Sequence, residues 1–257
     1  MIDLSKKMRN ADDFIKHLYV HMNELNQFVI FSGLTFQEFV SSVDQLENLL
    51  LLKNDNENED GSFNMHTRLA FVEESDLTKF SKVMSDKKGD LCWIDFSEEK
   101  KLNLLTPQEQ AELLYIGHKN EPIRTPFYHQ LQNRFVYLEK KDDRVTKVYF
   151  RELNDVNELV MTYFNNIVQA KERAASFWRR KPTSSTLAFN FKNYDEVREI
   201  FNDGVLLSVY RVEKPKVSYM LELRDVPEIN FPEEIWDDLN TILKRQPNVL
   251  VEATVKK

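Results

Sequence analysis

The sequence predicts an α+β fold of two mixed α/β halves joined by a long helix, with a ferredoxin-like βαββαβ unit as the C-terminal half. Three observations lead to this prediction. Apolar residues recur at helical spacing from Asn154 to Arg180. Before that stretch, strand-like and helix-like segments are mixed. After it, they follow the order strand, helix, two strands, helix, strand, which is typical of the split βαβ motif.

The long helix is predicted from one continuous apolar stripe. Asp155 and Glu158 form a capping pair at its start, and Pro182 ends it because proline cannot continue a helix. A stripe of this size must be buried, against the sheet of the chain itself or against a partner. Its main members are Val156, Val160, Tyr163, Ile167, Ala170, Ala174 and Phe177.

The first half is predicted from shorter patterns. Thr35 with Glu38, and Thr106 with Glu109, match the capping box that begins a helix, and Gly117 is placed to end the second of these helices. In chain order, the predicted elements are a helix over 11–26, a strand over 27–31, a helix over 35–50, a strand over 67–73, a helix over 76–85, a strand over 91–96, a helix over 106–116 and a hairpin over 135–151.

The second half has a more regular pattern. Its predicted elements are a strand over 186–191, a helix over 194–202, a hairpin over 205–224, a helix over 232–245 and a strand over 248–255. The chain therefore divides into four predicted parts. These are an N-terminal helical segment packed on the first half (1–65), the first α+β half (66–153), the connecting helix (154–181) and the ferredoxin-like half (182–257).

Composition narrows the functional classes. The formal net charge of -7 argues against a general nucleic-acid binder. The single cysteine, Cys92, excludes an internal disulfide and favours a reducing compartment. No signal peptide or membrane-spanning apolar run is visible, so we expect a cytoplasmic protein. The five glycines are isolated from one another, whereas phosphate-binding loops need clustered glycines. We therefore expect no nucleotide and no other cofactor.

The segment 118–133 is the first candidate site, because long irregular loops carry function more often than average. Lys119 and Arg124 can hold an anionic group, and a histidine can move protons. The competing interpretation, which we favour, is a crossover loop whose aromatic residues fill the core. No residue has an evident nucleophile–base partner, so no catalytic residue is assigned. The candidate ligand-binding residues are His118, Lys119, Arg124, Tyr128 and His129.

The basic end of the long helix is the second candidate. Its cations lie beside Phe177 and Trp178, a combination that can contact phosphate, nucleic acid or an acidic partner. The simpler interpretation, which we favour, is that the cations stabilise the negative end of the helix while the aromatic residues anchor it. The residues of this candidate basic patch are Arg173, Arg179, Arg180 and Lys181.

Two further patterns receive less weight. His17 and His21 are four apart on a predicted helix, a spacing that can place two imidazoles on one metal ion, but the ligand set lacks further partners and we assign no metal site.

The sheet face that carries Glu222 and Arg224 offers only one stacking aromatic, Tyr210, so we reject RNA recognition there. That semi-apolar face is predicted to be covered by the long helix, the other half or a second subunit.

The leading hypothesis is a non-enzymatic binding or regulatory protein that associates with another protein, or with itself, through the long helix and the semi-apolar sheet face. The alternative is a small-molecule-binding protein or an enzyme that uses the segment 118–133. A third hypothesis is nucleic-acid contact through the basic helix end, which the acidic net charge disfavours. We expect a protein partner or a homo-oligomer and no membrane contact.

Overall fold

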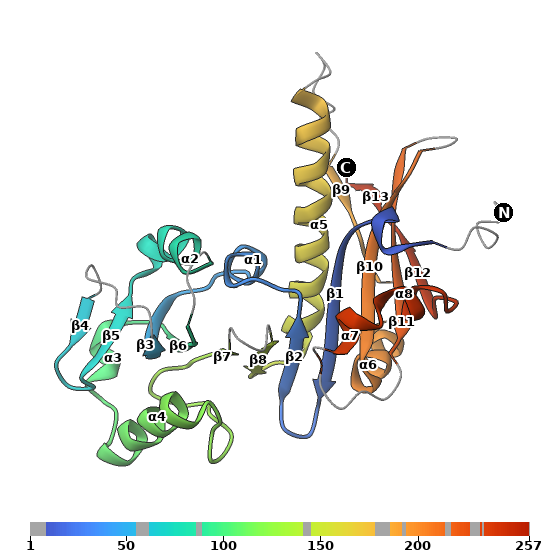
Figure 1. Cartoon of the computed structure of the whole chain (residues 1–257). Helices are drawn as coiled ribbons and strands as arrows, with labels where there is room; N and C mark the ends of the chain where they lie inside the picture. The colour runs from blue at the N-terminus through green and yellow to red at the C-terminus, as the bar shows by residue number, and fades with distance from the viewer. Residues whose placement is uncertain are drawn as a thin grey trace. The chain divides into compact units, whose positions relative to one another are not determined.

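The computed structural model describes residues 9–54, 62–85, 89–140, 145–177, 186–191, 194–213, 217–226, 232 and 234–256. The chain has a mixed α+β composition, as the sequence predicts, and its strands pair antiparallel (Figure 1). It divides into two compact units, one of residues 23–159 and one that combines residues 1–22 with 160–257. Each unit has its own hydrophobic core.

The unit of residues 23–159 is built on strands in the order β2-β8-β7-β6-β3-β5-β4. The inner strands β6 and β7 are buried along almost their whole length, as expected for strands whose two faces are both covered. The strands are β2 (Phe28–Ser32), β3 (Asn48–Asn54), β4 (Ser62–Asn64), β5 (Leu69–Val72), β6 (Leu91–Phe96), β7 (Phe135–Lys140) and β8 (Val145–Phe150).

Two helices cover one face of these strands with aromatic side chains. Phe36 and Phe39 of α1 contact the ring of Trp93, which stacks on the ring of Tyr137 with 5.0 Å between centroids. Phe80 of α2 contacts Phe36 in an edge-on arrangement. Aromatic pairs of this kind contribute beyond the area that they bury. These helices are α1 (Phe36–Ser42) and α2 (Leu77–Ser85), which follows the short 3-10 helix η2 (Glu74–Asp76).

The opposite face carries the core on which the candidate loop lies. Successive strand residues point to opposite faces, so Cys92 joins this core while Trp93 faces α1. Leu113 and Ile116 of α4 are buried in the same core. The helices on this side are α3 (Glu99–Leu102) and α4 (Pro107–Lys119).

The second unit contains four antiparallel strands in the order β12-β11-β10-β1 and a separate pair, β9 with β13. Its strands are β1 (Phe14–Asn23), β9 (Thr186–Ala188), β10 (Val205–Val212), β11 (Ser218–Asp225), β12 (Val249–Glu252) and β13 (Thr254–Lys256). Its helices are η1 (Ala11–Asp13), α6 (Tyr194–Asp203), α7 (Glu234–Asp237), α8 (Leu239–Leu243) and most of α5 (Asn154–Phe177).

The predicted long helix is confirmed as α5, which runs without a break to Phe177. Its apolar side is buried as far as Val168, while Ala170 and Ala174 are exposed. The hydroxyl of Tyr219 on β11 donates a hydrogen bond of 2.6 Å to Glu172, so α5 packs on the sheet of its own unit. Residues 178–180 of the predicted helix lie outside the described residues.

The prediction of a helix over residues 11–26 is wrong, because residues 14–23 form strand β1. Phe14, Leu18 and Met22 are spaced by four residues, and that spacing puts side chains on one face of a strand as well as of a helix. The β-branched Ile15 and Val20 favour the strand, and antiparallel pairing with β10 decides it.

Three other predicted elements have bounds that differ from those in the structure. The helix predicted over 35–50 ends at Ser42, and the leucine run that follows becomes the buried strand β3. A short apolar run is ambiguous between helix and strand until its neighbours are known. The helix predicted over 232–245 is divided into α7 and α8, and the last strand is divided at Ala253 into β12 and β13.

The ferredoxin-like arrangement of the C-terminal half is not confirmed. Its elements follow the predicted order along the chain from β9 to β12. Strand β9, however, pairs with β13 in a sheet of two strands, while β12 pairs with β11. Strand β1, from the N-terminal end of the chain, pairs with β10.

The semi-apolar sheet face is covered by α7 and α8 rather than by the long helix. Leu206 and Tyr19 on this face form a core cluster with Ile235, Ile242 and Leu243 of the two short helices. Helix α5 packs on the other face, which carries Tyr219. Within the parts of the chain that the structure describes, no helix has both the length and the apolar character to cross a membrane.

Candidate functional site

Helix α4 begins as predicted and continues past its predicted end. The hydroxyl of Thr106 accepts a hydrogen bond from the N–H of Glu109, whose carboxylate accepts one from the N–H of Thr106. Gly117 does not cap the helix: it lies within the last turn against the backbone of Leu52. The cap is Asn120, which adopts the left-handed conformation (φ 56°) and donates its N–H to Ile116.

The segment after α4 is held in one conformation by the buried side chain of Asn133. Its Oδ1 accepts a hydrogen bond of 2.8 Å from the N–H of Tyr128, and its Nδ2 donates to the carbonyl groups of Pro126 and Phe135. The guanidinium of Arg151 donates to the carbonyl oxygen of Asn133 at 2.6 Å. One amide group therefore provides the backbone partners that a strand or helix would otherwise supply.

The end of the segment is fixed by a buried carboxylate. Asp95 of β6 accepts hydrogen bonds from the N–H groups of Arg134 and Phe135 at 2.7–3.0 Å. The guanidinium of Arg134 reaches the carboxylate of Asp155 at 2.9 Å and the carbonyl oxygen of Asp44. These bonds connect the loop to β6 and to the start of α5.

We expect Asp95 to make stability depend on pH. Burial raises the pKa of this carboxyl to about 6, although its hydrogen bonds with the backbone of Arg134 and Phe135 oppose the rise. The folded state therefore binds this proton more tightly than the unfolded chain, and stability falls as pH rises from about 4 through about 6. Urea unfolding of the wild type and of Asp95→Asn at several pH values measures this effect.

The variant Asp95→Asn has no proton to lose at this position, so its stability should fall less steeply than that of the wild type between those pH values. The exposed Asp76, changed to Asn, is the matched control and should follow the wild-type profile. Parallel pH profiles for wild type and Asp95→Asn would contradict the assignment.

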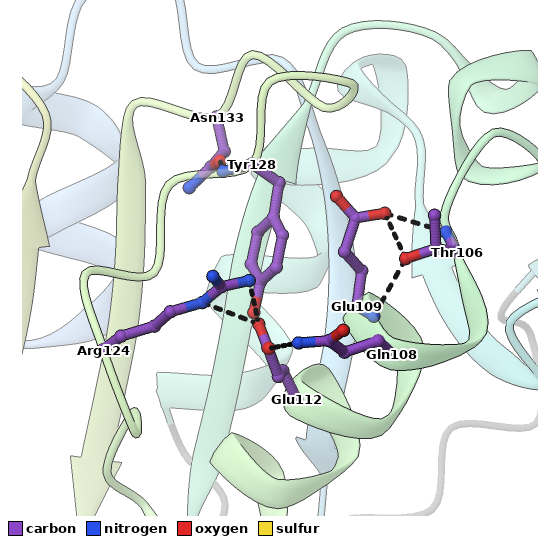
Figure 2. A network of polar contacts seen from close by, with 7 residues as sticks. All are labelled: Thr106, Gln108, Glu109, Glu112, Arg124, Tyr128 and Asn133. Atoms are coloured by element: carbon purple, nitrogen blue, oxygen red, sulfur yellow. Dashed lines mark hydrogen bonds and ion pairs between the residues drawn. The ribbon is translucent and has the colours of Figure 1, made fainter.

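Figure 2 shows how Arg124 lies against α4. Its Nε and Nη2 donate to one oxygen of Glu112 at 3.1 and 2.9 Å, and the other oxygen accepts from Gln108. The ring of Tyr128 extends toward the same carboxylate. Tyr128 is buried in the core, and both burial and the negative charge of Glu112 raise the pKa of its hydroxyl. The loop aromatic therefore fills the core, as the favoured interpretation of the sequence expects.

The structure does not gather the other candidate residues into one constellation. His118 and Lys119 are exposed on the last turn of α4. His129, which follows Tyr128 in the sequence, is exposed as well. Among the residues that the structure describes, no hydrogen bond or ion pair joins these three side chains to Arg124. Of the five predicted ligand-binding residues, only Arg124 and Tyr128 lie close to a common group, the carboxylate of Glu112.

The same region carries an exposed apolar surface that sequence reasoning missed. Leu114 and Tyr115 on α4 are 52% and 40% exposed, and Ile123 in the following loop is 67% exposed. Arg124, which follows Ile123 in the chain, pairs with Glu112 of α4. We call Leu114, Tyr115 and Ile123 the α4 surface. Apolar residues on both sides of α4, at positions 113–116, were a signal that one of its faces would be left uncovered.

The second candidate site is largely outside the described residues. Arg173 is exposed near the end of α5, while Arg179, Arg180 and Lys181 belong to the part of the chain that the structure does not describe. Their grouping stays a prediction.

The geometry of β1 changes the interpretation of the two histidines. Residues four apart in a strand are roughly 13 Å apart, so His17 and His21 cannot chelate one ion as they would on a helix. His17 is half-buried, and its Nδ1 lies 2.7 Å from the hydroxyl of Ser208. Across the described residues, no group of three or more histidine, cysteine or acidic side chains is arranged to hold a metal ion.

Comparison of the chain with protein-family models, with curated proteins and with solved structures found no match.

Proposed function

We propose that the protein is a non-enzymatic binding protein that associates with another protein, including a second copy of itself, through the α4 surface. The observation that carries this proposal is the exposure of Leu114 and Tyr115 on a folded helix and of Ile123 in the loop that follows it. Large apolar side chains that remain exposed together are typical of protein contact sites. His118 and Lys119 at the end of α4 would favour carboxylates at the rim of the partner.

The rigidity of this region supports the proposal. The capping box fixes the start of α4, and Asn133 with Arg151 fixes the loop. A surface that is ordered before binding loses little conformational entropy when a partner arrives, so more of the contact energy appears as affinity.

The long helix and the semi-apolar sheet face are less suitable for association. The apolar side of α5 is buried as far as Val168, and Leu206, Tyr210 and Met220 on the semi-apolar sheet face are buried as well. Use of the loop by a small molecule has less support, because Tyr128 and Leu131 fill the core beneath it. Nucleic-acid contact through the basic helix end stays a separate hypothesis.

Charge substitution on the α4 surface tests the proposal. We expect the double variant Leu114→Glu/Tyr115→Glu to lose association, by about thirtyfold in affinity, if these residues act as hot spots worth about 2 kcal/mol. Light scattering across a wide range of protein concentrations measures association between copies. Cross-linking in cells followed by mass spectrometry of the attached proteins measures association with other partners.

The matched control is Leu25→Glu, because Leu25 is 96% exposed and lies in the turn between β1 and β2. Association that survives in Leu25→Glu and is lost in the double variant supports the proposal. A protein that stays monomeric and whose cross-linked partners are the same for both variants rules out the α4 surface.

A further inference from the structure

The side of α4 that points away from the sheet is exposed along the helix. Its exposed residues recur three and four positions apart, which is the spacing of one helix face, while Leu113 and Ile116 are buried on the other side. Ala111, the smallest of the exposed residues, lies one turn before the two large apolar side chains. We call this set the outward face, and its members are Gln108, Ala111, Leu114, Tyr115, His118 and Lys119.

The charged residues of α4 are separated along the helix. Glu109 and Glu112 lie in its first half, whereas His118 and Lys119 lie in its last turn. Glu112 and Lys119 are seven residues apart, which is almost two full turns, so both lie along the same edge of the outward face. When two copies of such a helix lie antiparallel, the acidic half of each copy meets the basic end of the other.

A two-fold axis at Leu114 and Tyr115 brings these groups together. About this axis, position 111 of one copy lies opposite position 118 of the other, and Lys119 of one copy comes within one turn of Glu112 of the other. Because Ala111 is small, the two helices can approach closely there. Leu114 and Tyr115 of both copies then lie at the centre of the contact, where apolar side chains are fully desolvated.

Of the carboxylates near the end of α4, Glu112 is the one placed to receive a lysine. Arg124 donates twice to its Oε2 and Gln108 donates once to its Oε1, as Figure 2 shows. A carboxylate has about four acceptor sites, so one more donor can bind. Burial and the negative charge of Glu121 raise the pKa of Tyr149 on β8, which indicates that Glu121 lies toward the sheet rather than on the outward face.

We propose that Leu114 and Tyr115 of the α4 surface pack against the same residues of a second copy of the chain, with the two α4 helices antiparallel. The inference rests on the function proposed above, and it adds the identity of the partner and the orientation of the contact. The order of charges along α4 selects a second copy, because the helix complements itself in this arrangement. Parallel pairing would place Lys119 beside Lys119 and Glu112 beside Glu112.

Sedimentation equilibrium of the full chain over a wide range of concentrations gives the first test. We expect a reversible dimer and no larger species, because a two-fold contact uses the surface once on each copy. Lys119→Glu should weaken dimerisation about tenfold, since two attractive pairs become repulsive. The matched control is Lys82→Glu, which changes an exposed lysine in the last turn of α2 and should dimerise as the wild type does.

Disulfide cross-linking tests the orientation of the two helices. We expect chains with Ala111→Cys to form a disulfide with chains that carry His118→Cys. Chains with Ala111→Cys should form none with one another, because in an antiparallel pair their two positions lie about 10 Å apart along the helix. The native Cys92 is buried and does not compete.

A wild type that stays monomeric at every concentration would overturn the second copy as the partner. Equal dimerisation of the wild type and Lys119→Glu, or a disulfide between two chains with Ala111→Cys, would overturn the antiparallel contact.

Cross-linking in cells separates these failures from a failure of the proposed function. A monomeric protein that loses its attached proteins in Leu114→Glu/Tyr115→Glu keeps the α4 surface as a binding site and replaces the second copy by another protein. A monomeric protein whose attached proteins are the same in the wild type and in this double variant overturns both proposals.

Discussion

Replacing Asn133 by alanine is expected to lower the free energy of unfolding by about 3 kcal/mol. The change removes the partners of the Tyr128 N–H and of the carbonyl groups of Pro126 and Phe135, all in one buried position. Each buried polar group left without a partner costs about 1–3 kcal/mol, although a water molecule in the vacated space can satisfy part of the set. Equilibrium unfolding in urea measures the loss.

Hydrogen exchange within the loop should also change in this variant. We expect backbone amides between residues 123 and 132 to exchange hydrogen faster in Asn133→Ala, because Asn133 connects both ends of this segment. Thr125→Ala, an exposed substitution in the same loop, is the control and should unfold within about 0.5 kcal/mol of the wild type. If Asn133→Ala is as stable as Thr125→Ala, the loop is held by core packing alone.

Replacing Gly117 by alanine is expected to destabilise the protein by about 2–3 kcal/mol. On an exposed helix the same change would be favourable by about 1 kcal/mol, because alanine has the higher helix propensity. Here an added Cβ would lie 2.3 Å from the carbonyl oxygen of Leu52. The steric overlap exceeds the gain in propensity, so α4 must move away from β3.

The identity of the contacting atom gives a sharper test. The overlap is with a backbone oxygen, so shortening the Leu52 side chain cannot relieve it. We expect Leu52→Ala/Gly117→Ala to be less stable than either single variant in urea. A double variant that recovers the stability of Leu52→Ala alone would show that side-chain packing, rather than the backbone, limits the approach of α4.

The close approach at Gly117 and the bonding of Asn133 share one feature. Both depend on contacts that local sequence patterns do not identify: Gly117 meets a strand far away along the chain, and Asn133 bonds residues two to seven positions away in an irregular segment. Gly117 follows an apolar helix, so its local context predicts a cap, whereas its actual neighbour is Leu52 in β3. Asn133 lies in an irregular segment, where an asparagine normally indicates only a turn. Its role is visible only when Pro126, Tyr128 and Phe135 surround it.

Several elements could be predicted from local sequence patterns alone. The capping boxes at Thr35 and Thr106 begin helices α1 and α4 because their bonds join residues three apart. The hairpins β7–β8 and β10–β11 were also identified, since alternating strands around a short polar turn need no distant partner. Helix α5 follows from a stripe long enough to exclude a strand.

Where the periodicity of apolar residues fitted both a helix and a strand, contacts in the tertiary structure determined which one formed. A four-residue spacing is common to strand and helix, so residues 14–23 became a strand through pairing with β10. The charged face of β11 could be predicted from alternation, but the ion pair of Glu222 with Arg9 could not, because the two residues are more than two hundred apart in the sequence. Patterns of three or four residues determined the helix starts and hairpins. Burial, register and ion pairing required the folded chain, since they depend on contacts that sequence spacing does not record.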